Sequence, residues 1–251
     1  SAGQFSSNNI RLIKDATGKF YVAITPSQIY DRIFIRDATS ALLLGTSNNT
    51  KVYSALHFSG SDPCAQAFAT SYEGTGISLD ALKLGNSGGI NTERAIDADP
   101  GNFSQLSLGI LAVGGTASQV FYFSGLSNPT DDVNLRFKTT PSLLNIGLLN
   151  NISVTTYNGT QVVATQNINP NLLSLDLLGL LNNGSIVTIP FSPGGAYDRV
   201  KVTLNSLVGV NVLQAIDIYG VTRSAGRPTF SGPNGNTFQA CYNVPVGLTA
   251  T

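Results

Sequence analysis

The residues best suited to chemistry lie in one acidic turn, Ala95-Ile96-Asp97-Ala98-Asp99-Pro100-Gly101-Asn102-Phe103-Ser104. Its oxygen-bearing side chains are those of Asp97, Asp99, Asn102 and Ser104. Ca²⁺ takes about six to eight oxygen ligands, and a tight turn can supply side-chain and carbonyl oxygens together. The turn is not an EF-hand, because the twelfth position counted from Asp97 is Leu108. Two interpretations stay open: a calcium site, or an Asx-turn whose carboxylates accept hydrogen bonds from backbone N–H groups.

Residues for catalysis are sparse. The only histidine is His57, and glutamate occurs only at positions 73 and 93. No Gly-x-Ser-x-Gly, His-Glu-x-x-His or P-loop pattern occurs. Asp131 and Asp132 are neighbours in a predicted turn and are not expected to face one substrate. We therefore predict a protein that is not an enzyme and has no catalytic residues, with His57 on the surface of a strand.

The composition of the chain excludes several classes of partner. Its 251 residues are 42% hydrophobic and only 11% charged, with 14 basic and 14 acidic side chains. A neutral surface does not attract phosphate backbones or anionic lipids, so we predict no nucleic-acid partner. No apolar run approaches the ~20 residues that span a bilayer, so we also predict no membrane insertion. Low charge with many small polar residues favours an extracellular or cell-surface protein over the alternative, a cytoplasmic β-protein.

The elements that position these residues are organised by a repeat. The segment Gln28-Ile29-Tyr30-Asp31-Arg32-Ile33-Phe34-Ile35 recurs as Gly195-Ala196-Tyr197-Asp198-Arg199-Val200-Lys201-Val202. The match extends to residues 20–26 over 186–192 and to 52–56 over 218–222. The two Tyr-Asp-Arg triplets lie 167 residues apart, a period that indicates a repeated domain.

The first copy matches only the second half of the later one, and this sets the predicted domains. We expect residues 1–60 to be the C-terminal half of a β-sandwich repeat and residues 61–70 to be a linker. Residues 71–223 should form a complete sandwich, and 224–251 a linker or the start of a further module. The first residues, Ser1-Ala2-Gly3-Gln4, carry no signal sequence, so we expect that one was removed or that this is a piece of a longer protein.

The two cysteines each follow one copy. Cys64 and Cys241 lie in Gly/Ser/Pro-rich connections just beyond the first and second copies. In an oxidising compartment a disulfide between them would close a loop around the complete domain, and this is the pairing we predict. Two free thiols are the alternative.

Many short β-rich runs, separated by turn signals about every 8–12 residues, predict an all-β jelly-roll sandwich. The expected strands are 10–13, 20–24, 33–35, 51–56, 76–82, 118–123, 133–138, 152–157, 161–165, 186–189, 200–204 and 215–221. Asn158-Gly159 predicts a type I′ hairpin turn. Two leucine-rich stretches, 142–149 and 172–178, are expected to form short helices.

The acidic turn and the closing strand carry a family resemblance. The run from Arg94 to Ser104 resembles the Ala-x-Asp-Gly-Asp-x-x-Thr turn of discoidin-like, galactose-binding-like jelly rolls, and residues 213–220 resemble their last strand. Residues 71–223 also resemble repeats of large Bacteroidota surface adhesins linked to gliding motility and type IX secretion. The resemblance implies a structural Ca²⁺ at the turn, with Asp217 as a distant acidic ligand. Ala98 replaces the usual turn glycine, and Lys51 stands where the first copy should match Asp217.

Two functions follow from these features. The first is a structural repeat of a secreted adhesin or filament, whose partners are neighbouring copies of itself or adjacent repeats. In that case the Tyr-Asp-Arg triplets (Tyr30, Asp31, Arg32 and Tyr197, Asp198, Arg199) are scaffold residues. The alternative is a discoidin-like carbohydrate-binding module that binds surface glycans. Its candidate stacking aromatics are Tyr72, Phe103, Tyr122 and Tyr157, each of which could equally pack in the core.

Overall fold

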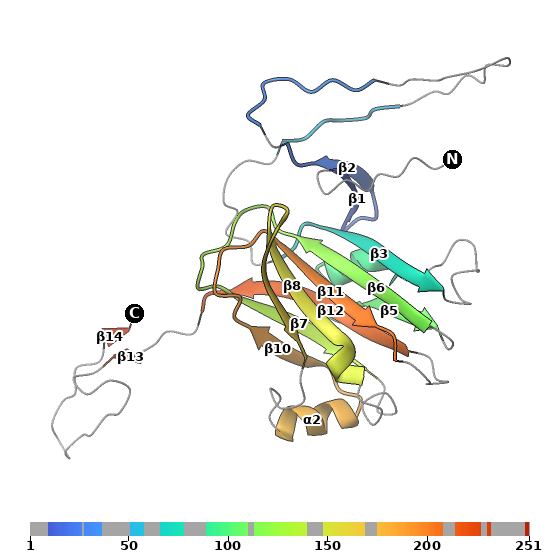
Figure 1. Ribbon diagram of the computed structural model, residues 1–251, viewed down its shortest axis with the longest axis vertical. Coiled ribbons are helices and arrows are strands. Elements are labelled where there is room, and N and C mark those ends of the chain that lie inside the picture. The colour runs from blue at the N-terminus through green and yellow to red at the C-terminus, as the bar shows by residue number, and fades with distance from the viewer. Residues whose placement is uncertain are drawn as a thin grey trace.

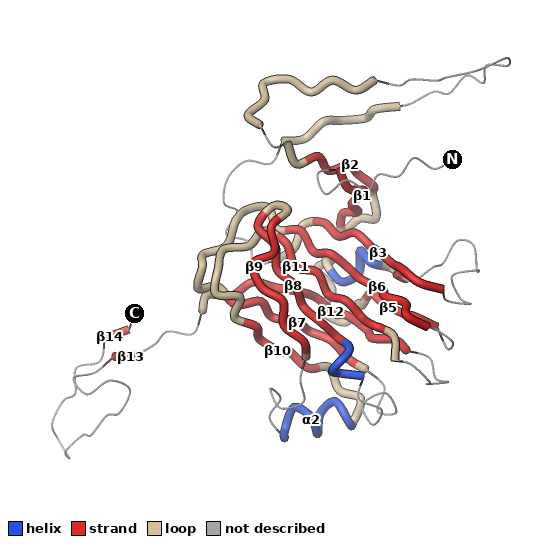
Figure 2. The backbone as a smooth tube through the Cα atoms, viewed as in Figure 1, coloured by secondary structure: helices blue, strands red, loops and turns tan. Residues whose placement is uncertain are grey.

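Two antiparallel β-sheets face each other across one apolar core (Figure 1). The computed structural model describes residues 10–26, 28–36, 51–57, 66–77, 89–109, 113–139, 148–168, 175–207, 214–226, 230–231 and 249–250. Figure 2 shows that strands dominate this part of the chain and that helices are confined to short segments at its margins. The fold is therefore the jelly-roll β-sandwich that the sequence predicts.

The larger sheet has seven strands in the order β2-β1-β3-β6-β11-β8-β9. Their bounds are β1 Ile10–Asp15, β2 Phe20–Ile24, β3 Ala69–Ile77, β6 Val113–Tyr122, β8 Ile152–Asn158, β9 Gln161–Asn167 and β11 Arg199–Asn205. The smaller sheet has five strands in the order β10-β7-β12-β5-β4. Their bounds are β4 Gly89–Ile90, β5 Ser104–Gly109, β7 Asp132–Lys138, β10 Val187–Phe191 and β12 Gln214–Ser224. A separate pair joins β13 Phe230–Ser231 to β14 Thr249–Ala250.

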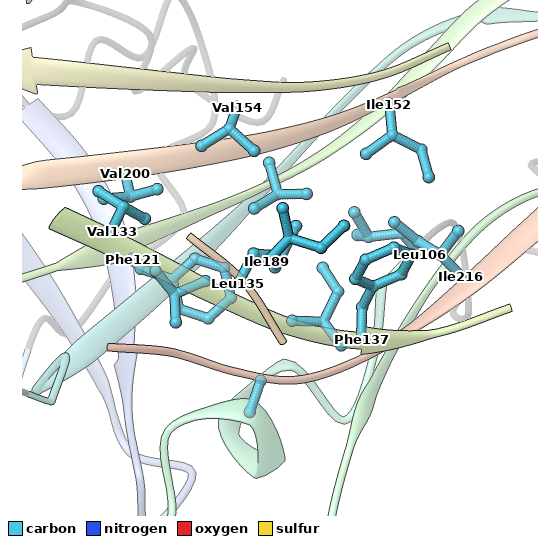
Figure 3. Packing of buried hydrophobic residues seen from close by; sticks show 14 of the residues in the cluster. Leu106, Phe121, Val133, Leu135, Phe137, Ile152, Val154, Ile189, Val200 and Ile216 are labelled. Carbon is cyan, nitrogen blue, oxygen red and sulfur yellow. The ribbon is translucent and has the colours of Figure 1, made fainter. Parts of the chain in front are cut away.

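The core forms because apolar residues alternate along the strands of both sheets. On β11, Val200, Val202 and Leu204 are buried while the residues between them are half-buried. The facing strands supply fully buried Leu135 and Phe137 from β7 (Figure 3). The alternation places one face of each strand in the core and thereby fixes the register of the sheets.

The helices are short. Residues 92–95 form the 3₁₀ helix η2, residues 148–151 form η3, and residues 175–182 form the α-helix α2. The helix α2 confirms the second leucine-rich prediction with a shift of three residues; most of the first lies outside the described residues. None of the helices described here is long and apolar enough to cross a membrane.

Most predicted strands of the complete copy are confirmed. Sequence reasoning missed β5, which follows the acidic turn directly, and placed the first strand of the sandwich too late, since β3 begins at Ala69. Gln66 also bridges to Thr222, so the end of the predicted linker already contacts the sandwich. The expected type I′ turn is wrong: the loop is Gly159-Thr160, and of the hairpin residues only Gly159 has a positive φ, 59°. A glycine at the first loop position is typical of a type II′ turn.

The first copy departs from the prediction. Its strands β1 and β2 form a hairpin on the edge of the larger sheet. Residues 33–35 and 51–56 were expected to be strands, but no strand is assigned within 28–36 or 51–57. In Figure 1 these segments extend beyond β2, away from the sandwich. None of the described strands pairs with them as β6 and β8 pair with β11, and β5 and β7 with β12, in the second copy, so no described strand supplies a hydrogen-bonding ladder for them.

Candidate functional site

The acidic turn is held by hydrogen bonds within itself. Asp97 Oδ1 accepts a hydrogen bond from the Asp99 N–H at 3.0 Å, and Asp97 Oδ2 accepts one from Asn102 Nδ2 at 2.8 Å. Asp99 Oδ1 accepts a hydrogen bond from the Gly101 N–H at 2.8 Å. These are the contacts of the Asx-turn interpretation, in which a carboxylate caps backbone N–H groups two residues ahead.

The other two predicted calcium ligands are used elsewhere. Ser104 is fully buried between the sheets, where its hydroxyl donates to Gln119 Oε1. Asp217 Oδ1 accepts a hydrogen bond from Gln105 Nε2 at 2.9 Å. Since successive side chains of a strand point to opposite faces, Ser104 and Asp217 lie on opposite faces of the smaller sheet.

The predicted calcium ligands therefore divide into separate groups. Asp97, Asp99 and Asn102 come together in the turn, but among the described residues no three His, Cys, Asp or Glu side chains form a group able to hold a metal ion. Calcium at this turn stays a prediction. Cys64 and Cys241 lie outside the described residues, so the disulfide also stays a prediction.

Tyr197 of the second Tyr-Asp-Arg triplet is anchored inside the sandwich. Its ring is fully buried and packs edge-on against Phe123. Its hydroxyl donates to the Asp132 carbonyl at 3.0 Å, and its N–H donates to Ser127 Oγ at 2.9 Å. Burial raises the pKa of Tyr197 to about 12, although the nearby Arg223 guanidinium opposes the shift. These contacts support the scaffold role of this residue.

Of the other two residues of that triplet, Asp198 makes contacts within the second copy and Arg199 also contacts the first copy. Asp198 Oδ1 accepts a hydrogen bond from the Gly159 N–H at 3.1 Å, and lies 3.5 Å from Arg199 Nε. Burial raises the pKa of Asp198 despite the adjacent guanidinium. Arg199 is buried, lies over the ring of Tyr122 and donates to Thr25 Oγ1 at 3.1 Å. Thr25 directly follows β2, so this arginine contacts the preceding copy.

The first triplet is in a different environment. Asp31 and Arg32 are almost fully exposed, with 4.0 Å between Asp31 Oδ2 and Arg32 Nε. Tyr30 contacts His57 edge-on, with ring centroids 6.0 Å apart. His57 is exposed, as the sequence predicts, but it does not lie in an assigned strand.

The β1–β2 hairpin meets the sandwich through an ionic and apolar contact that sequence reasoning missed. Both glutamates of the chain face β1: Glu73 pairs with Arg11 and Glu93 with Lys14. Lys201 Nζ also donates to Glu73 Oε2 at 2.7 Å, so this carboxylate lies between two cations. Burial alone would raise the pKa of Glu73, but Lys201 and Arg11 outweigh it and hold that pKa below its usual range. The sequence offered one sign of this contact: glutamate occurs only at positions 73 and 93, and both pair with β1.

An apolar cluster lies beside these ion pairs. It consists of Ile13 on β1 and Ala69, Val120 and Tyr122 on β3 and β6, with Tyr21 and Ala23 of β2 packed against it. Among the described residues, direct strand pairing between β1 and β3 joins only Lys14 with Thr70 and Asp15 with Ala69. The hairpin is therefore attached mainly through its side chains.

The candidate sugar-stacking aromatics are largely occupied. Tyr122 is buried and its hydroxyl lies 3.0 Å from Ser71 Oγ, and Tyr72 packs against the main core. Tyr157 is half-buried on β8. Phe103 is half-buried against Tyr219, with ring centroids 5.3 Å apart. Arg136 lies over the Tyr219 ring and donates to the Pro100 carbonyl at 3.0 Å, which places a polar group beside these two aromatics.

Comparisons with known proteins give only distant likenesses. No family model matches the chain. No curated protein matches it. Among solved structures, the family 32 carbohydrate-binding module of NanJ from C. perfringens in complex with galactose is 12% identical, with a TM-score of 0.35, and the match covers 61% of this chain and 92% of that one. The third such module of a family 31 glycoside hydrolase from Clostridium perfringens is 11% identical, with a TM-score of 0.29, covering 64% of this chain and 90% of that one. We draw no functional conclusion from likenesses at this level.

Proposed function

We propose that this chain is a non-catalytic β-sandwich repeat of an extracellular adhesin or filament, in which successive copies are joined in a fixed orientation. The observation that carries the proposal is the contact between the first copy and the second copy. In the β1–β2 hairpin, Arg11 forms an ion pair with Glu73 and Lys14 forms one with Glu93. Arg199 of the sandwich donates a hydrogen bond to Thr25.

The nature of this contact suits orientation more than affinity. Partly exposed ion pairs contribute only about 0–1 kcal/mol each, but they require their two side chains to meet in one geometry. The buried side of the hairpin adds the Ile13 cluster, which supplies apolar area. A hinge between copies would leave such a contact unformed, whereas a repeat that positions its neighbours needs it.

A double substitution, Glu73→Gln with Glu93→Gln, tests this contact between the β1–β2 hairpin and the sandwich, which we call the joint. We expect amide hydrogen exchange of residues 10–24 to accelerate while exchange in β7 and β12 stays unchanged. The matched control is Asp176→Asn, which removes an exposed carboxylate on α2 and should change neither region. Unchanged exchange at residues 10–24 in the double variant would refute a positioned joint. Antibody labelling of intact source cells tests the extracellular location.

The second candidate function is carbohydrate binding. It is favoured by the half-buried pair Phe103 and Tyr219 beside Arg136, because sugar rings stack on aromatic faces flanked by polar groups. A glycan array probed with the whole chain tests it. A defined sugar, bound by the wild type and lost in Tyr219→Ala, would place this reading above the structural repeat; no bound sugar would leave the structural repeat as the better account.

A further inference from the structure

The exposed apolar side chains of this protein are concentrated in the first copy. Of the sixteen large hydrophobic side chains that are exposed in the described residues, twelve lie between residues 12 and 56. They are Leu12, Phe20, Val22, Ile24, Ile29, Tyr30, Ile33, Phe34, Ile35, Val52, Tyr53 and Leu56. An apolar surface of this extent on a folded protein indicates a contact with something else.

The repeat tells us which of these side chains should be buried. Ile33 and Ile35 are 53% and 57% exposed, whereas their counterparts Val200 and Val202 on β11 are 0% exposed. Val52 is 55% exposed, whereas its counterpart Ile218 on β12 is 0% exposed. The same residue types at the same positions therefore build the core in one copy and face solvent in the other.

Among the described residues, the first copy also has an unpaired edge where the missing strands would join. In the second copy β10 lies at the edge of the smaller sheet and, among the described strands, pairs with β7 alone. Its counterpart β2 is the outermost strand that the structure describes in the larger sheet, and within that part of the chain it pairs with β1 alone. The other side of β2 can therefore accept a strand equivalent to β7 while the contact with β1 stays in place.

We infer that residues 20–24, 28–36 and 51–57 are the equivalents of β10, β11 and β12 in another sandwich, and that they are completed by a half-sandwich of the β3–β9 type from a neighbouring repeat. This inference rests on the proposed function and names the partner that the repeat takes. The partner would resemble residues 66–168 of this chain in sequence, because those residues receive the equivalent strands here. Pairing would supply backbone partners and would cover Ile33, Ile35 and Val52 together.

Stoichiometry argues against a second copy of this chain as the partner. Each chain carries one β3–β9 half, and its own β10, β11 and β12 already fill that half. If the first copy of one molecule displaced those strands in another, it would release as many apolar strands as it covered. Exchange between identical chains therefore leaves one set of strands exposed per molecule.

The test extends the full chain by placing a second copy of residues 66–166 ahead of Ser1, which restores the spacing of the later copy. In the unextended chain we expect rapid amide exchange at residues 30–36 and 51–57. In the extended chain we expect exchange there to slow by at least about a hundredfold, because the amides enter a cooperative sheet. Unchanged exchange in the extended chain would overturn the inference. Slow exchange in the unextended chain, together with a dimer mass, would overturn it in favour of a second copy.

Two neighbouring substitutions make the test specific. Ile35→Lys puts a charge where Val202 is buried, so it should abolish the slowed exchange in the extended chain. Phe34→Lys is the matched control, because Lys201 already stands at that position on β11, and it should leave the slowed exchange intact. Equal effects of the two would overturn the inference. The contact between β1 and the sandwich is read at residues 10–15, which lie outside the completed strands, so its failure is distinguishable from failure of the completion.

Discussion

Tyr197→Phe removes one hydroxyl from the centre of the sandwich, and its effect should depend on pH in a defined way. The hydroxyl donates to the Asp132 carbonyl at 3.0 Å, and the ring is fully buried. Losing this hydrogen bond leaves a shielded carbonyl without that donor. At pH 7 we expect the free energy of unfolding to fall by about 1–2 kcal/mol.

The alkaline range should show the opposite trend. The pKa of Tyr197 rises from 10.0 to about 12 on folding, so the residue is neutral in both states below pH 10 and its contribution to stability is then complete. Between pH 10 and 12 the unfolded tyrosine ionises while the folded one resists, and stability is lost as the pH rises. A shift of this size corresponds to a loss of roughly 2 kcal/mol by pH 12, which the phenylalanine variant does not suffer.

Urea unfolding followed by far-ultraviolet circular dichroism at several pH values measures both effects. We expect the variant to be the less stable protein at pH 7 and the two curves to converge above pH 10. Tyr30→Phe is the matched control from the first copy; that ring is exposed, so stability should change by less than about 0.5 kcal/mol at every pH. Curves for wild type and Tyr197→Phe that stay parallel from pH 8 to 11.5 would refute the reasoning.

Three further substitutions test other contacts. Gln119→Leu should lower the free energy of unfolding by about 2–4 kcal/mol, because buried Gln119 forms hydrogen bonds with Ser104, Thr70 and the Thr92 carbonyl. The control in the same urea titration is Gln166→Leu, an exposed position on β9, and equal losses in the two variants would contradict the network. Glu73→Gln should weaken attachment of the β1–β2 hairpin, and the effect should be largest at low salt. In the wild type the ion pairs of Glu73 should be lost as the pH falls through the lowered pKa of Glu73, because that carboxylate is then protonated. The rate of limited proteolysis between β2 and β3 measures the attachment, and a rate that does not depend on pH would contradict the ion pairs. Asp97→Ala should lower the free energy of unfolding by about 1 kcal/mol, with or without a chelator, because it removes two hydrogen-bond acceptors from the turn. Thermal unfolding with and without Ca²⁺ measures this effect. A melting temperature that Ca²⁺ raises in the wild type but not in the variant would instead support the predicted metal site.

The sandwich was predictable because its signals are local. Alternating apolar residues mark β7, β11 and β12, and Gly159 marks the hairpin between β8 and β9 even though the turn type differs. The strand β5 was missed because the acidic turn runs into it without a break, so turn residues hid its first position.

The role of the charged residues was much harder to predict. The ion pair between Arg11 and Glu73 joins residues 62 positions apart in sequence, and no local sequence pattern predicts it. The calcium hypothesis rested on residue types in one turn, whereas the direction of each side chain depends on strand alternation that only the assembled sheet defines. Ser104 and Gln105 are neighbours in sequence, yet one faces Gln119 inside and the other faces Asp217 outside.

The isolated bridge between Gln66 and Thr222 has a mechanical consequence. Because the pair is antiparallel, the segment that begins at Gln66 and the strand that ends at Ser224 have these two ends on the same side of the sandwich. Tension applied at these two ends would therefore act across a gap of roughly 5 Å and would break the bridge before the rest of the sheet. About 150 residues lie between those two points, enough for roughly 500 Å of extended chain. Unfolding of one sandwich would thus release a long extended segment, and a row of such repeats would lengthen under tension one repeat at a time.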